Sequence, residues 1–223
     1  MSRRERVRAL LADVVWRSAL LMLAAAAIVA LAFATGLSER AAGHVDHDSP
    51  TVGRQGHGAH VVRDESDFLV SMIIHHQEAV ASAQAMLEIT ERDEVRQLAR
   101  SIVHEWSAEI EQLRSWLAAG HPERVATEGG AGAAVAVSAF EPMMRPFVGL
   151  RPAEAEEVFV SDLIRHHEAA MAMAESYLGL PGPKAPEVVA FARETLRIAS
   201  AEIRVLELLL QMWGVAPVDH GSH

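Results

Sequence analysis

Two similar stretches, HHQEA at residues 75–79 and HHEAA at residues 166–170, lie 91 positions apart in this chain of 223 residues. Around each stretch, apolar side chains recur every three or four residues, which is the period of one broad helix face. The surroundings match as well, since Phe68 aligns with Phe159. After a two-residue insertion in PGPKAP, Ala108-Glu109-Ile110 aligns with Ala201-Glu202-Ile203. The sequence therefore predicts two copies of one helical hairpin, which we place at residues 64–120 and 152–214.

Local signals divide each copy into two helices. The pattern Thr90-Glu91-Arg92-Asp93 is typical of a capped helix start, and Gly120 suits the end of that second helix. Pro152 and Pro186 each suit the first turn of a further helix. Helices of about 25 residues with wide apolar faces bury those faces best in a four-helix bundle. Strand signals are essentially missing, so we expect an all-α domain over residues 64–214.

The segments outside the hairpins have a different composition. Residues 38–63 hold four histidines among Gly, Asp, Ser and Pro without an apolar period, which predicts a flexible linker. Residues 121–151 are rich in Gly, Ala and Pro, and we interpret them as a crossover between the hairpins. Residues 215–223 form a short tail.

The N-terminal segment predicts export. Residues 18–37 form an uncharged run long enough to cross a bilayer as a helix. The basic residues 1–17, which we expect to stay in the cytoplasm, precede it, so everything after the run is expected outside. A cleaved signal peptide fits equally well, because Ala32-Phe33-Ala34 resembles a cleavage site. We expect either a membrane-anchored extracytoplasmic domain or a secreted one.

Charge and composition exclude several partners. Residues 1–17 carry five arginines against Glu5 and Asp13, a balance of +3; because the whole chain carries −10, the remainder carries −13. Nucleic acids and anionic lipid surfaces would repel that remainder. The chain has no cysteine, which removes disulfides and thiolate metal sites together. A metal ion would have to be held by His, Met or carboxylate.

The paired histidines are the main candidates for such a site. Burying an imidazole costs about 1 to 3 kcal/mol unless it finds a hydrogen-bond or metal partner, so a purely apolar core would favour leucine. Two hairpins that clasp each other would bring the pairs together at a similar height in the bundle. Neutral imidazole binds copper, zinc and iron, and thioether sulfur adds a preference for Cu(I). The candidate ligands are the two histidine pairs and three methionines at helical spacing from them: His75, His76, His166, His167, Met72, Met171 and Met173.

Two other interpretations remain open. The histidines could form only a hydrogen-bonded core in an envelope module without metal. Alternatively, the aligned Glu109 and Glu202 could join them in a ferritin-like metal oxidase, or could orient the imidazoles as second-shell partners. The Glu-x-x-His pattern of di-iron bundles is absent, because His75-x-x-Glu78 runs in the reverse order and Ala169 aligns with Glu78. We therefore favour binding over turnover.

The motifs resemble a known family. Asp67-Phe68, Met72, His75-His76 and Ala79, followed by Phe159, His166-His167, Ala170 and Met173-Ala174, are similar to the signature of the bacterial "domain of unknown function 305" family. The resemblance implies a ferritin-like fold and an exported or anchored protein. Some members are linked to copper binding and copper tolerance, so it implies copper as the ion, with zinc or iron as alternatives. It also implies roles for the histidine pairs, for Met72 and Met173, and for a Met-bearing segment resembling Met143-Met144. Ser82 and Leu163 stand where the pattern has methionine.

Overall fold

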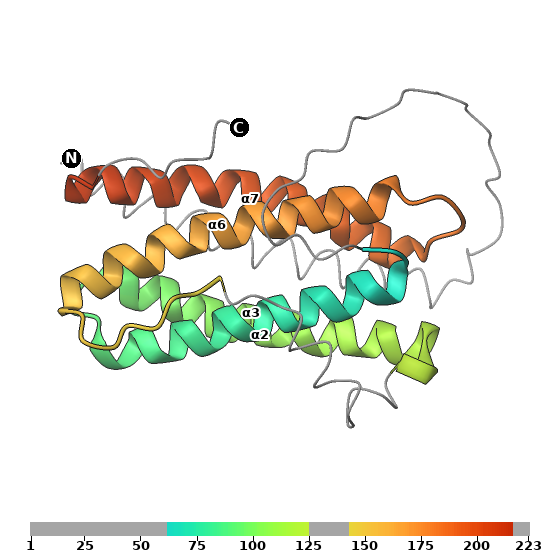
Figure 1. Cartoon of the computed structure of the whole chain (residues 1–223), viewed down its shortest axis with the longest axis horizontal. Helices are drawn as coiled ribbons and strands as arrows, with labels where there is room; N and C mark the ends of the chain where they lie inside the picture. The colour runs from blue at the N-terminus through green and yellow to red at the C-terminus, as the bar shows by residue number, and fades with distance from the viewer. Residues whose placement is uncertain (1–61, 125–142, 216–223) are drawn as a thin grey trace.

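The computed structural model describes residues 62–124 and 143–215, whose regular structure is helical, without any strand. Four long helices dominate these residues (Figure 1): α2 (Glu65–Ile89), α3 (Asp93–Gly120), α6 (Pro152–Gly179) and α7 (Pro186–Trp213). The predicted all-α class is confirmed for this part of the chain. The predicted segments 1–17 and 18–37, residues 38–61 of the predicted linker 38–63, and the tail beyond Val215 lie outside it. Among the described helices, none is long and apolar enough to cross a membrane.

The helices form two hairpins packed against each other. α2 packs on α3, α6 packs on α7, and α2 also packs on α6. α2 and α6 run in opposite directions, so the α2–α3 turn lies beside the start of α6 and the α6–α7 turn beside the start of α2 (Figure 1). Between the two hairpins, the main contact is that of α2 with α6.

Most of the helix ends follow the local signals in the sequence. Pro152 and Pro186 each occupy the first turn of their helix, where the missing proline N–H costs no hydrogen bond. Gly214 ends α7 with a φ of 77°, a left-handed conformation that favours glycine. The cap predicted at Thr90 is wrong, because α3 begins only at Asp93 and its N-cap residue, Arg92, makes no side-chain capping bond.

A buried carboxylate on α6, and not the Thr90 side chain, accepts hydrogen bonds from the backbone N–H groups just before α3. Glu156 Oε1 accepts hydrogen bonds from the Thr90 hydroxyl at 2.7 Å and from the backbone N–H groups of Glu91 and Arg92 at 2.9 Å each. Its Oε2 accepts from the Arg92 guanidinium at 2.7 Å. One side chain of the second hairpin therefore holds the turn of the first, which no local pattern could indicate.

The same arrangement recurs at the other end of the bundle. Glu65, which aligns with Glu156 in the predicted repeats, accepts from the Tyr177 hydroxyl at 2.6 Å and from the backbone N–H of Ala185 at 2.8 Å. Tyr177 in turn stacks on Phe68, with ring centroids 4.5 Å apart. Each hairpin thus contributes one glutamate that fixes the turn region of the other.

Only the two ends of the predicted crossover, residues 121–124 and 143–151, are described. Residues 143–151 lie against the start of α6 and are held by two acidic side chains. Glu78 on α2 accepts from the Met144 N–H at 2.6 Å, and buried Asp162 on α6 accepts from the N–H of Arg145 at 2.8 Å and from its guanidinium. Residues 125–142 of the predicted crossover lie outside the described part.

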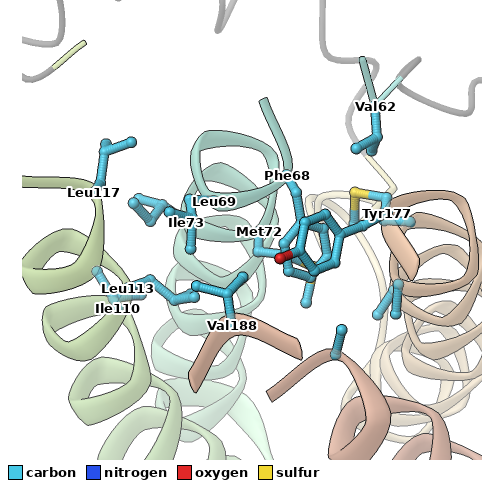
Figure 2. Packing of buried hydrophobic residues seen from close by; sticks show 14 residues of the cluster. Val62, Phe68, Leu69, Met72, Ile73, Ile110, Leu113, Leu117, Tyr177 and Val188 are labelled. Atoms are coloured by element: carbon cyan, nitrogen blue, oxygen red, sulfur yellow. The ribbon is translucent and has the colours of Figure 1, made fainter. Parts of the chain in front are cut away.

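The core consists of two apolar clusters, one toward each end of the bundle. The first surrounds Phe68, Met72, Leu113 and Tyr177 (Figure 2), and the second surrounds Phe159, Leu163 and Leu209. The four paired histidines belong to neither cluster and are buried between them. A polar layer therefore interrupts the apolar core at mid-height.

Candidate functional site

The two hairpins place their first histidines in direct contact. The rings of His75 on α2 and His166 on α6 stack with centroids 3.4 Å apart and an interplanar angle of 26°. His166 Nε2 lies 3.0 Å from the backbone oxygen of His75. Because a carbonyl only accepts, Nε2 carries the proton, which leaves the lone pair of the neutral ring on Nδ1. That Nδ1 is buried and has no hydrogen-bond partner among the described residues.

The second histidine of each pair bonds to a carboxylate from its own hairpin. His76 Nε2 lies 2.9 Å from Glu109 Oε2 on α3, and His167 Nε2 lies 3.1 Å from Glu202 Oε2 on α7. The two glutamates that align in the sequence therefore occupy equivalent places. A carboxylate accepts a hydrogen bond from Nε2–H and leaves the lone pair on Nδ1 free to bind a metal ion, which is how a carboxylate orients a metal-binding histidine. In His76 this Nδ1 is buried without a partner among the described residues.

An aromatic side chain that the sequence analysis did not single out completes the layer. Trp106 on α3 stacks on His166 with centroids 5.1 Å apart, and its ring lies 5.1 Å from His76 and 5.6 Å from His167. In the predicted repeats, Trp106 aligns with Ala199. In the sequence, Trp106 could be recognised only as a member of the apolar stripe of α3. That position also fits an ordinary core residue.

A small pocket opens between α3 and α7 onto this layer. Its volume is about 50 Å³, which is enough for an ion and one or two waters. His76, His166 and His167 lie on its inner wall, and Trp106 and Ala199 flank them. Glu105, Glu109 and Glu202 supply the acidic part of the lining.

Burial keeps the two central imidazoles neutral. Loss of solvation lowers the pKa of His75 well below 6.5, and repulsion from the neighbouring imidazolium forms, His166 first, lowers it further. The pKa of His166 is lowered well below 6.5 for the same first reason, opposed by its bond to the His75 carbonyl. Burial also raises the pKa of the Glu105 carboxyl, and the nearby charges of Glu202 and Glu109 raise it further. A neutral imidazole is the form that binds a metal ion.

The candidate residues fit a metal ion by the chemistry of their donor atoms. The buried, unpartnered Nδ1 atoms of His76 and His166, and the carboxylates bonded to Nε2 of His76 and His167, match the expected donor set. Within residues 62–124 and 143–215, however, no three His, Asp or Glu side chains converge as a group that could hold one ion. Binding would require rotation of these side chains.

The methionine candidates lie away from the pocket wall. Met72 and Met173 are buried in the first apolar cluster, which Figure 2 shows with Met72, Phe68 and Val188 labelled. The sulfur of Met171 lies 3.7 Å from the Ser200 hydroxyl. Met143 is partly buried, and Met144 packs in the second cluster. The structure therefore gathers the four histidines and the two glutamates but none of these five thioethers.

The chain is thus a helical-bundle protein with a buried layer of paired histidines. The outer histidine of each pair is bonded to a glutamate. The chain belongs to the family described as "Domain of unknown function (DUF305)", whose model matches residues 65–210. The resemblance seen in the motifs is thereby confirmed. None of the curated proteins matches the sequence.

Solved structures share this fold. A DUF305 protein from Streptomyces coelicolor, provisionally described as secreted, is 20% identical with a TM-score of 0.55, and the match covers 71% of this chain and 99% of that one. CopM in its Cu(II)-bound form is 21% identical with a TM-score of 0.51, covering 66% of this chain and 96% of that one. CopM soaked with silver is 24% identical with a TM-score of 0.51, covering 66% and 95%. At these identities the similarity shows the fold alone.

Proposed function

We propose that this chain is an exported metal-binding protein that holds a copper ion at the histidine layer of its bundle and buffers it or passes it on. The observation that carries the proposal is the meeting of four buried imidazoles from two hairpins, with Glu109 and Glu202 bonded to the outer two. Imidazoles are costly to bury, and a ligand role would offset that cost. The copper- and silver-bound forms of CopM, which shares the fold, support copper as the ion.

Export belongs to the same proposal. The apolar run at residues 18–37 and the basic residues before it support a membrane anchor or a signal segment. The family member from Streptomyces coelicolor that is provisionally described as secreted agrees with an extracytoplasmic location.

Metal titration of the full chain tests the proposal, provided that the histidines outside the described bundle are removed first. We therefore define a reference protein in which six histidines are replaced by alanine: His44, His47, His57, His60, His220 and His223. Titration of copper and zinc into this reference should show uptake that the double variant His76→Gln/His167→Gln loses. His104→Ala is the matched control, because His104 is exposed on α3 and lies outside the layer. Equal uptake by the reference and the double variant would reject the histidine layer as the site.

A second candidate function is an envelope module whose histidines only stabilise a polar core. It is favoured by the hydrogen bonds that His76, His166 and His167 already make, and by the absence of a ready three-ligand group among the described residues. Elemental analysis of protein isolated from its native membrane or medium separates the two. Metal-free protein would support the structural module, and bound copper or zinc would support the metal site.

A further inference from the structure

The pocket between α3 and α7 offers only nitrogen and oxygen donors. Among the described residues that line it, the groups able to bind an ion are three imidazoles and three carboxylates: His76, His166, His167, Glu105, Glu109 and Glu202. Two of these imidazoles present buried Nδ1 atoms without a hydrogen-bond partner, on His76 and His166, which are 5% and 1% exposed. These nitrogens, unlike the exposed carboxylates of an ordinary helix surface, require a partner to offset their burial.

The methionine sulfurs, which are soft metal ligands, are not among the groups that line the pocket. Met72 and Met173 pack among aromatic and aliphatic side chains of the first apolar cluster, and they are 0% and 4% exposed. The sulfur of Met171 lies 3.7 Å from the Ser200 hydroxyl, and Met171 is not among the residues that line the pocket. Exposing the sulfurs of Met72 and Met173 to the pocket would require the first apolar cluster to be repacked. The pocket therefore offers nitrogen and oxygen ligands, which are harder donors than thioether sulfur.

The charge of the pocket favours an ion of higher valence. Glu105, Glu109 and Glu202 lie on both sides of the opening, on α3 and α7. The attraction between a carboxylate and a cation scales with the cation's charge, so a divalent ion gains about twice as much as a monovalent one at the same distance. Imidazole and carboxylate donors suit Cu(II) and Zn(II), whereas Cu(I) and Ag(I) prefer thioether or thiolate.

From these observations we infer that the α3–α7 pocket is a nitrogen–oxygen site selective for a divalent ion, Cu(II) or Zn(II), over monovalent Cu(I) or Ag(I). This inference rests on the proposed function, because it specifies the ion that the histidine layer takes. Its nitrogen ligands come from both hairpins: His166, whose buried Nδ1 has no partner among the described residues, and the two outer histidines, His76 and His167. Glu109 and Glu202 orient those rings, and Glu105 adds negative charge at the opening.

Competition titrations in the reference protein test the selectivity. Zn(II) and Cu(II) are titrated against chelators of known affinity, and Ag(I) serves as the monovalent probe because it does not oxidise. The paired change Glu109→Gln/Glu202→Gln keeps the side-chain shapes and should weaken divalent binding by about 10- to 100-fold. The triple change Met72→Leu/Met171→Leu/Met173→Leu should leave divalent affinity unchanged within about twofold. Thermal melts of each variant establish that it is folded.

Tryptophan emission gives a second readout that does not depend on affinity. Trp106 borders the pocket, whereas Trp116 on the same helix packs against Phe191 with ring centroids 5.9 Å apart and does not line it. Cu(II) in the pocket should quench the emission of the reference protein and of Trp116→Phe. The Trp106→Phe variant should lose most of that quenching.

The outcomes separate this inference from the proposed function. Binding of a divalent ion that depends on Glu109 and Glu202 and not on the three methionines supports the inference. Ag(I) binding tighter than Zn(II), lost in the methionine triple variant, would overturn the inference and leave metal binding by the bundle intact. If neither divalent nor monovalent ions bind above the level of the His76→Gln/His167→Gln variant, both the inference and the proposed function fail.

Discussion

His75 and His166, from α2 and α6, stack face to face with their ring centroids 3.4 Å apart, and the Nε2 of His166 bonds the backbone oxygen of His75. Two imidazoles in this contact cannot both become cations without strong repulsion inside a poorly solvated core. The contact between the two hairpins therefore favours the neutral form of both rings.

Stability should consequently depend on pH in a defined window. The folded-state pKa of each ring lies well below its ordinary value of 6.5, so the unfolded chain binds more protons as the pH falls. Stability is fully present above about pH 6.5 and is lost as the pH falls toward the folded-state pKa values. Two such groups give a slope of at most about 2.7 kcal/mol per pH unit.

Urea unfolding at pH 7.5, 6.5 and 5.5 measures this slope. His104→Ala should keep it, because that imidazole is exposed on α3. His75→Asn, which removes one titrating ring, should reduce it even though overall stability falls. A flat profile between pH 7.5 and 5.5 would contradict the buried, neutral pair.

Glu156 should be among the most sensitive carboxylates of the fold. It is 1% exposed and accepts from the Thr90 hydroxyl, two backbone N–H groups and the Arg92 guanidinium. Glu156→Gln removes the charge from a buried ion pair and places an N–H₂ group against donors. We expect a loss of about 2 to 4 kcal/mol in the free energy of unfolding.

Chemical denaturation compares this variant with Glu154→Gln, two residues earlier on the same helix, whose side chain is solvent-accessible. The control should leave the unfolding midpoint nearly unchanged. Similar effects of the two changes would show that the α2–α3 turn does not depend on Glu156.

Asp162 should control the order of the segment that leads into α6. Its fully buried carboxylate accepts from the Arg145 N–H and guanidinium and also contacts Arg165. Asp162→Asn halves its acceptor capacity and removes the charge, so residues 143–151 should open more often. Hydrogen exchange at the Arg145 amide should become at least about tenfold faster, which corresponds to about 1.4 kcal/mol of local stability.

The matched control for that experiment is Glu194→Gln, which breaks an ion pair with Arg197 on α7, far in sequence from the segment. Exchange at Arg145 should not respond to it. Unchanged exchange in Asp162→Asn would mean that the Glu78 bond to Met144 alone holds the segment.

Metal binding should appear as added stability. An ion that binds only the folded state at 100 times its dissociation constant raises the free energy of unfolding by about 2.7 kcal/mol. We expect Zn(II) to raise the melting temperature of the reference protein, in which the six histidines outside the described bundle are replaced by alanine. EDTA should reverse the rise. The His76→Gln/His167→Gln variant should show no rise, and an equal rise in both proteins would locate the ion elsewhere.

The helices and their apolar faces could be predicted from the sequence because their signals are local. Pro152, Pro186 and Gly214 act within one turn of the chain, and the spacing of apolar residues fixes which side of a helix is buried. The same spacing placed the histidine pairs inside, and the alignment of Glu109 with Glu202 indicated equivalent positions for both.

Which residues of different helices contact one another could be determined only from the tertiary structure. The periodicity of α2 and α6 puts Met72 and Met173 on the histidine faces, but their height along the bundle places them in the first apolar cluster instead of the pocket. Trp106 could be recognised as part of the histidine layer only once α3 was packed on α2 and α6. The bonds of Glu156 to residues 90–92 join positions more than 60 residues apart. Sequence periodicity fixes a side chain's direction about its own helix axis, whereas the register and crossing of two helices arise only from the packing of both surfaces.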